Sequence, residues 1–176
     1  MQWCHDLRGT ARRCHVNNNP ARPFAIRLAV SADVSHIAGM SREAIEQGLG
    51  WSWKPDRVQR YLQDRDSNVI VACDQQRLAG FGIMKYKADE AHLLLLAVNT
   101  QYRRRGVGKS LVAWLEQTVL TAGVGCIYLE TRLLNTAARN FYRKLGYREI
   151  RTINGYYQGK EDAVLMAKDL WDVAVV

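Results

Sequence analysis

The chain has 176 residues, of which 48% are hydrophobic, and it carries a formal net charge of +8. This length fits one compact domain, because a chain of this size buries roughly two thirds of the surface that it exposes when unfolded. No apolar run approaches the roughly 18 uncharged residues that a membrane span needs, and the first twenty residues lack the apolar stretch of a secretory signal. We therefore expect an intracellular, cytoplasmic protein without a membrane partner.

The basic charge and the cysteines do not indicate a nucleic-acid or metal partner. Positive charge is spread along the chain except for the cluster Arg103–Arg105, and no nucleic-acid motif accompanies it, which favours a local anion site. The four cysteines lie far apart, so no disulfide framework is predicted. The pairs Cys4-His5 and Cys14-His15 match no usual zinc spacing, and we expect no metal.

Residues 1–22 show no hydrophobic period, contain three consecutive asparagines and are rich in arginine. This composition predicts a flexible basic N-terminal extension. The folded domain is expected over residues 23–170, with a short C-terminal tail over 171–176.

The sequence of the first half of the domain predicts one strand, then two helices, then three strands. Residues 23–30 indicate a strand, and a helix opened by Ser31 or Asp33 follows, with apolar residues at spacings of three and four. A second helix is expected over 55–64. Three strands joined by connections short enough for antiparallel hairpins come next, over 68–74, 77–87 and 91–98.

The second half alternates helices and strands before closing with two strands. The predicted elements are a helix over 107–121, a strand over 126–132, a helix over 136–145 capped by Asn135, and strands around 147–153 and 162–168. An antiparallel front half that leads into a parallel strand–helix–strand unit defines the fold class. We expect an α/β fold with a mixed, mostly antiparallel sheet of six to seven strands flanked by about four helices.

The segment QYRRRGVGKSL (101–111) ends like the phosphate loop of nucleotide triphosphatases. That loop needs Gly-x-x-x-x-Gly-Lys-Ser, and the position of its first glycine holds Arg103, whose side chain obstructs the required backbone geometry. The segment instead favours an anion cradle. Gly106 and Gly108 let the backbone pass close to a ligand, and the helix that begins there points unpaired N–H groups at it. A solvated basic loop at a helix start is the alternative.

Two motifs in order carry a family resemblance. Arg103-Arg104-Arg105-Gly106-Val107-Gly108 fits the signature Arg or Gln, two residues, Gly, one residue, Gly or Ala, and LETRLLNTAARNFYRKLGY (129–147) provides a strand, an Asn-capped helix and a Leu-Gly-aromatic ending. On these motifs the chain resembles the GNAT superfamily of acetyl-CoA-dependent N-acetyltransferases over about residues 23–170. Its C-terminal half is most similar to the branch that acetylates the N-terminal alanine of a ribosomal protein. The resemblance implies an acyl-CoA N-acyltransferase fold.

The resemblance implies acetyl-CoA as the acetyl donor. Its pyrophosphate is expected on the backbone amides between Arg104 and Lys109, and its pantetheine arm on the exposed backbone of the strand that precedes them. The cosubstrate-binding residues expected from the resemblance are Leu96, Ala97, Val98, Arg103, Arg104, Arg105, Gly106, Val107, Gly108, Lys109, Ser110, Asn135 and Tyr142.

Transfer of acetyl to an amine needs a base for the amine and an acid for the leaving thiolate. Glu130, at the end of a buried strand, is the first candidate base, with His92 in reserve. Tyr142 is the candidate acid, because a phenol titrates in the same range as a thiol. Two structural readings compete with these roles: Glu130 paired with Arg132 or Arg143, and Tyr142 as a core aromatic residue.

The acceptor is left open by the sequence. The resemblance makes Tyr156 and Tyr157 candidates for a peptide pocket, and Trp51 and Trp53 can form a lid over a substrate. A protein N-terminus, a lysine, a polyamine, an amino acid and an antibiotic all remain open as acceptors, as does a homodimer. A CoA-binding regulatory module without turnover is the alternative to an enzyme.

Overall fold

The computed structural model describes residues 4–5, 11–12 and 24–171. Two-residue strands β1 (Cys4–His5) and β2 (Ala11–Arg12) pair with each other antiparallel. The rest of the predicted extension over 1–22, and the predicted tail beyond Trp171, lie outside the described residues.

The elements of the domain follow in the predicted order. They are β3 (Ala25–Leu28), α1 (Val34–Ala44), α2 (Pro55–Gln63), β4 (Ser67–Asp74), β5 (Arg77–Tyr86), β6 (Glu90–Val98), α3 (Val107–Thr121), β7 (Cys126–Arg132), α4 (Thr136–Lys144), β8 (Arg148–Tyr157) and β9 (Glu161–Asp169). Short 3-10 helices precede α1 (Ser31–Asp33) and follow β6 (Thr100–Tyr102).

Two strands differ in length from the prediction. The first strand was expected over 23–30, and β3 ends at Leu28 because the 3-10 turn closes at Val30, whose N–H donates to the Asp33 carboxylate at 2.8 Å. The strand expected around 147–153 continues to Tyr157. Its ladder with β9 is interrupted between Ile153 and Tyr157, so apolar alternation is lost where the strand continues.

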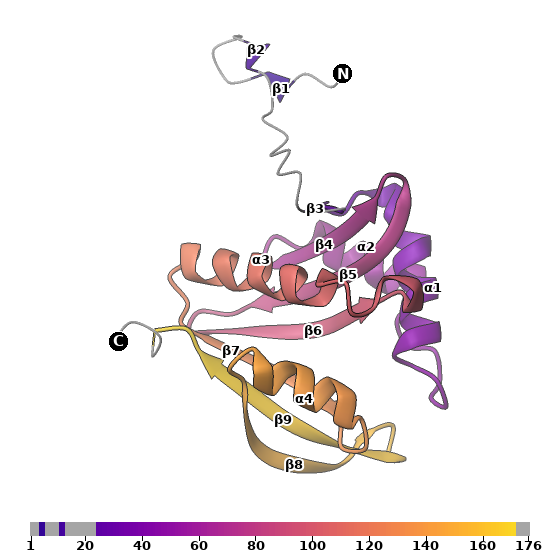
Figure 1. Cartoon of the computed structure of the whole chain (residues 1–176), viewed down its shortest axis with the longest axis vertical. Helices are drawn as coiled ribbons and strands as arrows, with labels where there is room; N and C mark the ends of the chain where they lie inside the picture. The colour runs from indigo at the N-terminus through magenta and orange to yellow at the C-terminus, as the bar shows by residue number, and fades with distance from the viewer. Residues whose placement is uncertain (1–3, 6–10, 13–23, 172–176) are drawn as a thin grey trace.

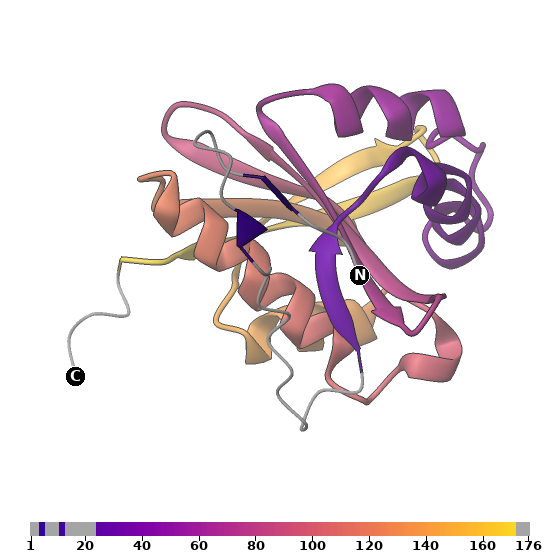
Figure 2. The same ribbon diagram turned by 90° about the horizontal axis from the view of Figure 1, so that it is seen from above.

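Seven strands form one sheet in the order β3-β4-β5-β6-β7-β9-β8, which confirms the mixed, mostly antiparallel α/β fold. Helices α3 and α4 cover one face, and α1 and α2 cover the other (Figures 1 and 2). Each face has its own apolar cluster, built on α3 and α4 in one case and on α1 and α2 in the other. Among the helices of the described ranges, none combines the length and apolar composition that a bilayer crossing requires.

A β-bulge at Leu94 changes which face β6 presents. Leu93 and Leu95 pair with consecutive residues of β5, so Leu94 is the extra residue. Strand side chains alternate with a period of two, and one extra residue therefore reverses the alternation. Ala91 and Leu93 accordingly pack on the α3 side, whereas Leu95 and Ala97 pack on the side of α1 and α2.

Helix α3 lies close to β5 because β5 carries glycine where the two meet. A Cβ atom at Gly80 would lie 2.7 Å from the Ala97 carbonyl oxygen and 3.2 Å from Leu111. A Cβ atom at Gly82 would lie 3.0 Å from Leu115. Both glycines thus allow the apolar face of α3 to pack directly on the backbone of the sheet, which fixes where the helix begins.

Candidate active site

Strands β6 and β7 pair over three residues only and then part. Their parallel ladder runs from Glu90 with Cys126 to His92 with Tyr128. Beyond it, β6 stays paired with β5 as far as Val98, and β7 stays paired with β9. Within the described residues, the facing edges of β6 and β7 therefore have no ladder partner, and the strands diverge (Figure 1). An open edge of this kind can accept an amide-containing arm in the manner of an added strand.

The predicted pantetheine-binding residues lie on this open stretch of β6. Leu96, Ala97 and Val98 each pair with β5 on one side only. The carbonyl oxygen of Val98 accepts a hydrogen bond from Arg103 Nε at 3.4 Å, which links the strand to the basic loop that follows it.

The start of α3 presents free amides. The N-cap is Gly106, with φ at 83°, and Arg104 also has a positive φ of 64°. Among the hydrogen bonds of the described residues, none uses the N–H groups of residues 104–109, and the first one of the helix runs from Ser110 N to Gly106 O at 3.0 Å. This run of unpaired donors at a helix N-terminus is suited to a pyrophosphate.

Side chains around these amides are arranged for an anion. Arg103, Arg104, Arg105 and Lys109 are exposed, and none of them forms an ion pair with a carboxylate of the described residues. Val107 is 1% exposed, so it anchors the helix and contributes its backbone alone. The cradle therefore combines main-chain donors with four cations.

Gly106 and Gly108 serve different purposes. Nothing lies within 4 Å of a Cβ atom built on Gly106, so that position needs glycine for its left-handed backbone. A Cβ atom on Gly108 would lie 3.2 Å from Phe141 and 3.5 Å from Val98. Gly108 thus keeps open the narrow space between the start of α3, the end of β6 and α4.

The two candidate bases form one hydrogen-bonded pair. His92 Nε2 lies 2.6 Å from Glu130 Oε2, and the two side chains are 24% and 12% exposed. His92 ends the paired part of β6, and Glu130 lies two residues past the end of the ladder on β7. Both side chains point to the face covered by α1 and α2, because their neighbours Leu93 and Leu129 pack on the other face.

The structural reading of Glu130 as a partner of Arg132 or Arg143 is wrong. Arg132 pairs with Glu161 at 3.1 Å, and Arg143 pairs with Glu149 at 2.8 Å. Glu130 is therefore not neutralised by either arginine.

Tyr156 and Tyr157 lie beside this pair. Their rings meet edge to face with centroids 5.0 Å apart. Burial, followed by the nearby Glu130 carboxylate, raises the pKa of Tyr156 to about 12. Burial also raises the pKa of Tyr157, with the charges of Tyr156 and Glu130 adding to it. The predicted acceptor residues thus stand as protonated phenols next to the candidate base.

Tyr142 lies on the opposite face, in the cluster under α4. It is 7% exposed, and its ring packs edge to face against Phe141 at 5.1 Å and Tyr147 at 5.5 Å. Burial raises the pKa of Tyr142 well above that of a free phenol, so the expectation that it titrates in the range of a thiol is wrong. Its hydroxyl is protonated at physiological pH and forms no hydrogen bond within the described part of the chain.

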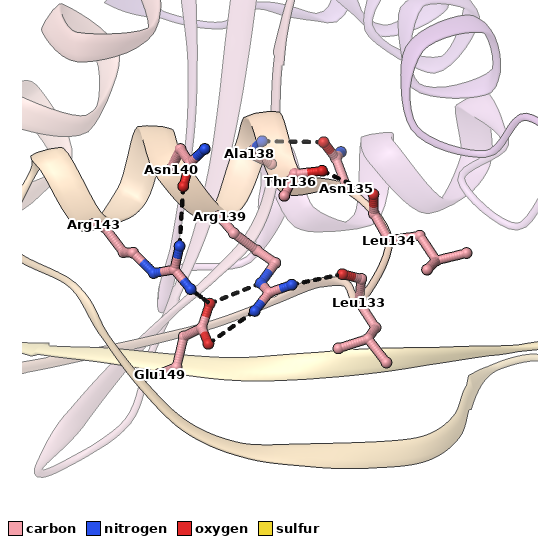
Figure 3. Close-up of polar contacts among 9 residues, drawn as sticks. All are labelled: Leu133, Leu134, Asn135, Thr136, Ala138, Arg139, Asn140, Arg143 and Glu149. Atoms are coloured by element: carbon pink, nitrogen blue, oxygen red, sulfur yellow. Dashed lines mark hydrogen bonds and ion pairs between the residues drawn. The ribbon is translucent and has the colours of Figure 1, made fainter.

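Helix α4 is held by a polar network (Figure 3). The Asn135 side chain caps the helix by accepting from Ala138 N at 3.0 Å, as predicted. Arg139 donates to both oxygens of Glu149, at 2.7 and 3.0 Å, and Arg143 donates to the same carboxylate. These contacts hold α4 against β8, and they therefore fix the position of Tyr142 relative to the sheet.

The connection between α1 and α2 carries the two tryptophans. Trp53 is 8% exposed, packs on Tyr61 at 5.1 Å and has the Arg57 guanidinium 4.1 Å above its ring. Trp51 is half-buried and donates from Nε1 to the Trp53 carbonyl oxygen at 3.1 Å. Burial leaves Trp53 little surface for an acceptor, whereas Trp51 stays a predicted substrate contact.

Sequence reasoning missed Glu46, a carboxylate that organises this connection. It is 6% exposed and accepts from Ser52 N at 2.7 Å, Ser52 Oγ at 2.6 Å and Ser41 Oγ at 3.2 Å, with longer contacts from Trp53 N. The sequence offers no spacing motif for such a contact. Only the burial of an acidic side chain among hydroxyl and amide donors identifies it.

Within residues 4–5, 11–12 and 24–171, no three His, Cys, Asp or Glu side chains gather in a way that could hold a metal ion. The pair Cys14-His15, considered from the sequence, falls outside these ranges.

The free amides at the start of α3 and the unpaired edge of β6 together fit a ligand that has a diphosphate and an amide-containing arm. The model of the Acetyltransferase (GNAT) family matches residues 38–147, and the chain belongs to this family. The free amides and the space kept open by Gly108 fit acetyl-CoA, the family's donor. The protein is thus an acetyltransferase that moves acetyl from acetyl-CoA to an amine.

Individual relatives agree with this assignment. The chain is 37% identical over 123 residues to the ribosomal protein bS18-alanine N-acetyltransferase of Salmonella typhimurium, covering 66% of this chain and 79% of that one. It is 29% identical over 158 residues to the N-alpha-acetyltransferase of Sulfurisphaera tokodaii, covering 85% and 95%. The crystal structure of the ribosomal-protein-S18-alanine N-acetyltransferase from Escherichia coli matches with a TM-score of 0.73 and 27% identity, covering 84% of this chain and 94% of that one.

Proposed function

We propose that the acceptor is the α-amine of a polypeptide N-terminus, and that acetyl passes to it directly from acetyl-CoA in a ternary complex. The observation that carries the proposal is the His92–Glu130 pair at the point where β6 and β7 part. This pair stands on the face opposite Tyr142, so a base and an acid flank the opening from its two sides.

The pair is suited to taking a proton from an amine. With the His92 imidazole donating from Nε2 to Glu130 Oε2, the carboxylate keeps lone pairs that can accept the proton of the acceptor amine. We assign this tautomer because a carboxylate can only accept. The imidazole then orients Glu130 and stabilises the geometry in which the proton is received.

An α-amine is a better match for this base than a lysine side chain. Reference pKa values of about 8 for an α-amine and about 10.4 for lysine mean that the neutral, nucleophilic form of the α-amine is roughly two orders of magnitude more abundant at neutral pH. Within the described residues, the side chains near Glu130 include the phenols of Tyr156 and Tyr157, and the nearby carboxylate of Glu161 is paired with Arg132 at 3.1 Å, so little unpaired acidic charge is offered to a polyamine. Two relatives named above are a ribosomal protein bS18-alanine N-acetyltransferase and an N-alpha-acetyltransferase, and both names fit acetylation of an α-amine.

Direct transfer is supported by the place of the cysteines. Cys126 begins β7, inside the zipped part of the ladder and four residues before Glu130, which is roughly 13 Å along a strand. Burial raises the pKa of Cys73, which disfavours a thiolate there. Neither Cys73 nor Cys126 is therefore suited to carry acetyl covalently beside the base.

Tyr142 acts on the leaving group. Its protonated hydroxyl donates a hydrogen bond to the sulfur as negative charge develops, and its raised pKa makes hydrogen bonding easier than complete proton transfer to a thiolate. A backbone N–H of β6, which we assign to Val98, stabilises the oxyanion.

The proposal is tested by following thiol release from acetyl-CoA with a panel of acceptors. The panel contains a short peptide with a free N-terminus, the same peptide with a blocked N-terminus and one internal lysine, spermidine and an aminoglycoside. We expect kcat/KM for the free N-terminus to exceed each of the others at least tenfold. A higher value for spermidine or the aminoglycoside would contradict the proposal.

A further inference from the structure

The loop that carries the first free amides lies between two buried side chains. Tyr102 ends the 3-10 helix after β6 and is 8% exposed, and Val107 begins α3 and is 1% exposed. Both side chains belong to the apolar cluster on the α3 side of the sheet. Residues 103–106, between them, are all exposed. The direction in which the amides of this loop point therefore depends on how its two ends are held.

The two ends are held in different ways. Val107 is apolar and is held by packing, beside Gly80 of β5. The Tyr102 hydroxyl also donates a hydrogen bond to Asp74 Oδ2, at 3.1 Å. The phenol is the donor, because it is protonated at neutral pH and a carboxylate can only accept. Apolar packing has no preferred direction, whereas a hydrogen bond restricts both distance and angle, so Tyr102 fixes its end of the loop more closely.

The acceptor of this hydrogen bond is placed by a tight hairpin. Asp74 is the last residue of β4 and pairs with Arg77, the first residue of β5, across the turn that joins the two strands. Among the contacts of residues 4–5, 11–12 and 24–171, the Tyr102 hydroxyl is the one hydrogen bond to the Asp74 carboxylate, which forms no ion pair. The sheet thus offers the loop a fixed acceptor.

Two features of the loop need support from Tyr102. Arg104 has a positive φ of 64°, and a residue with a side chain keeps this conformation only where its surroundings enforce it. The Arg105 guanidinium carbon lies 5.7 Å from the centre of the Tyr102 ring, a distance at which a cation is attracted to an aromatic face. The position of the ring therefore influences both the backbone of the loop and one of its cations.

We propose that Tyr102 is a positioning residue for donor binding: its hydrogen bond to Asp74 holds residues 103–106 in the conformation that directs their amides and Arg105 at the diphosphate of acetyl-CoA. Tyr102 acts through the loop and needs no contact with the donor. Without the bond, the donor has to order the loop when it binds, and that cost weakens its affinity. The inference concerns the donor and does not depend on which amine receives the acetyl group.

Three variants isolate the hydrogen bond. Tyr102→Phe removes the hydroxyl and keeps the buried ring and its contact with Arg105. Asp74→Ala removes the acceptor, whereas Asp74→Asn keeps an acceptor oxygen. Both Asp74 variants remove the same negative charge near the arginines, so the difference between them reports the hydrogen bond and not the charge.

The matched control is Tyr86→Phe. Tyr86 also packs against the cluster on the α3 side, and its hydroxyl lies 2.6 Å from Thr118 Oγ1 and accepts from Asn68 Nδ2 at 2.8 Å. It is the last residue of β5, whereas the hairpin with Asp74 lies at the other end of that strand, roughly 30 Å away. Its hydroxyl is therefore bonded in the same cluster but far from the loop.

Isothermal titration of the full chain measures the Kd of CoA and of pantetheine, which has the amide-containing arm and the thiol but no diphosphate. We expect Tyr102→Phe and Asp74→Ala to raise the Kd of CoA five- to tenfold each, and the double variant to raise it no further, because both remove one bond. Asp74→Asn and Tyr86→Phe should change it less than twofold. The Kd of pantetheine should change less than twofold in every variant.

Several outcomes would overturn the inference. One is a Kd of CoA in Tyr102→Phe that stays within twofold of the wild type. Another is an equal increase for CoA and pantetheine, or an equal increase in Tyr86→Phe, because a general loss of structure would cause either. Multiplied effects in the double variant would show that the two residues act separately. If Gly108→Trp binds CoA as tightly as the wild type, the donor lies away from the loop and the inference fails with that site.

Discussion

His92 Nε2 and Glu130 Oε2 lie 2.6 Å apart, at the point where the ladder between β6 and β7 ends. Beyond this point, the unpaired backbone of β6 is free to bind the donor. The first side chains of β7 past the ladder are placed to contact the acceptor. The end of the ladder thus places the proposed proton-accepting pair beside the region where a thioester arm can pair with β6.

Replacing the base should affect the chemical step and not donor binding. We expect Glu130→Gln to lower kcat about 100- to 1,000-fold, because the amide cannot take the proton of the amine. His92→Gln should lower kcat less, about 10-fold, because it removes only the group that orients the carboxylate. Steady-state kinetics measure both, and titration with CoA is the control. Unchanged kcat in Glu130→Gln would exclude it as the base.

Removing the Tyr142 hydroxyl should slow departure of the thiolate. We expect Tyr142→Phe to lower kcat about 10- to 100-fold, while the ring keeps its contacts with Phe141 and Tyr147 and the melting temperature changes little. A donor with a better leaving thiol should restore part of the rate. If the variant loses the same factor with every donor, Tyr142 does not act on the sulfur.

Substitutions at two glycines of the same motif should distinguish backbone strain from loss of donor binding. Saturating acetyl-CoA at about 100 times its Kd should stabilise the wild type by about 2.7 kcal/mol, roughly 5–10 °C for a domain of this size. Gly108→Trp should abolish the shift, because its side chain fills the space beside Phe141 and Val98. Gly106→Ala should cost about 1 kcal/mol through its φ of 83° and still show a shift. Equal shifts in wild type and Gly108→Trp would place the donor elsewhere.

The Arg139–Glu149 pair should contribute to stability in a pH-dependent way. Hydrogen bonds from Arg139 lower the pKa of Glu149 below its usual value. Its stabilising effect is therefore present above the unfolded pKa and is lost as pH falls through the lower, folded pKa. Glu149→Gln should destabilise the protein at pH 7 and do so much less at pH 2, measured by urea unfolding. The same cost at both pH values would contradict the ion pair.

Much of the fold was predictable from local patterns. The face of α3 that carries Val107 and Leu111 repeats with the helical period, and Asn135 and the glycines mark helix ends, so these elements were found within a few residues. The bulge at Leu94 could not be seen, because it falls inside LLLL, a run with no alternation to interrupt. The position of β9 between β7 and β8 can be predicted from composition. β9 is more apolar than β8, as expected of a strand with a neighbour on each side.

The sequence names candidate site residues one by one but does not give their arrangement. His92 and Glu130 were separate candidates, because nothing in the sequence fixes the register of two parallel strands joined through a helix. The burial that raises the pKa of Tyr142 depends on how α4 packs, which Arg139 and Glu149 set from different elements. Contacts between distant segments, such as Gly50 with Gln158, leave no pattern in a single sequence.

A crystal structure of the protein with CoA is the most direct test of how the donor binds. We expect the pyrophosphate on the main-chain N–H groups of residues 104–109, and the pantetheine arm hydrogen-bonded to β6 between Leu93 and Val98, with its thiol between Glu130 and Tyr142. A complex in which those amides stay unbound, or in which β6 and β7 zip together beyond His92 and the thiol lies elsewhere, would contradict it.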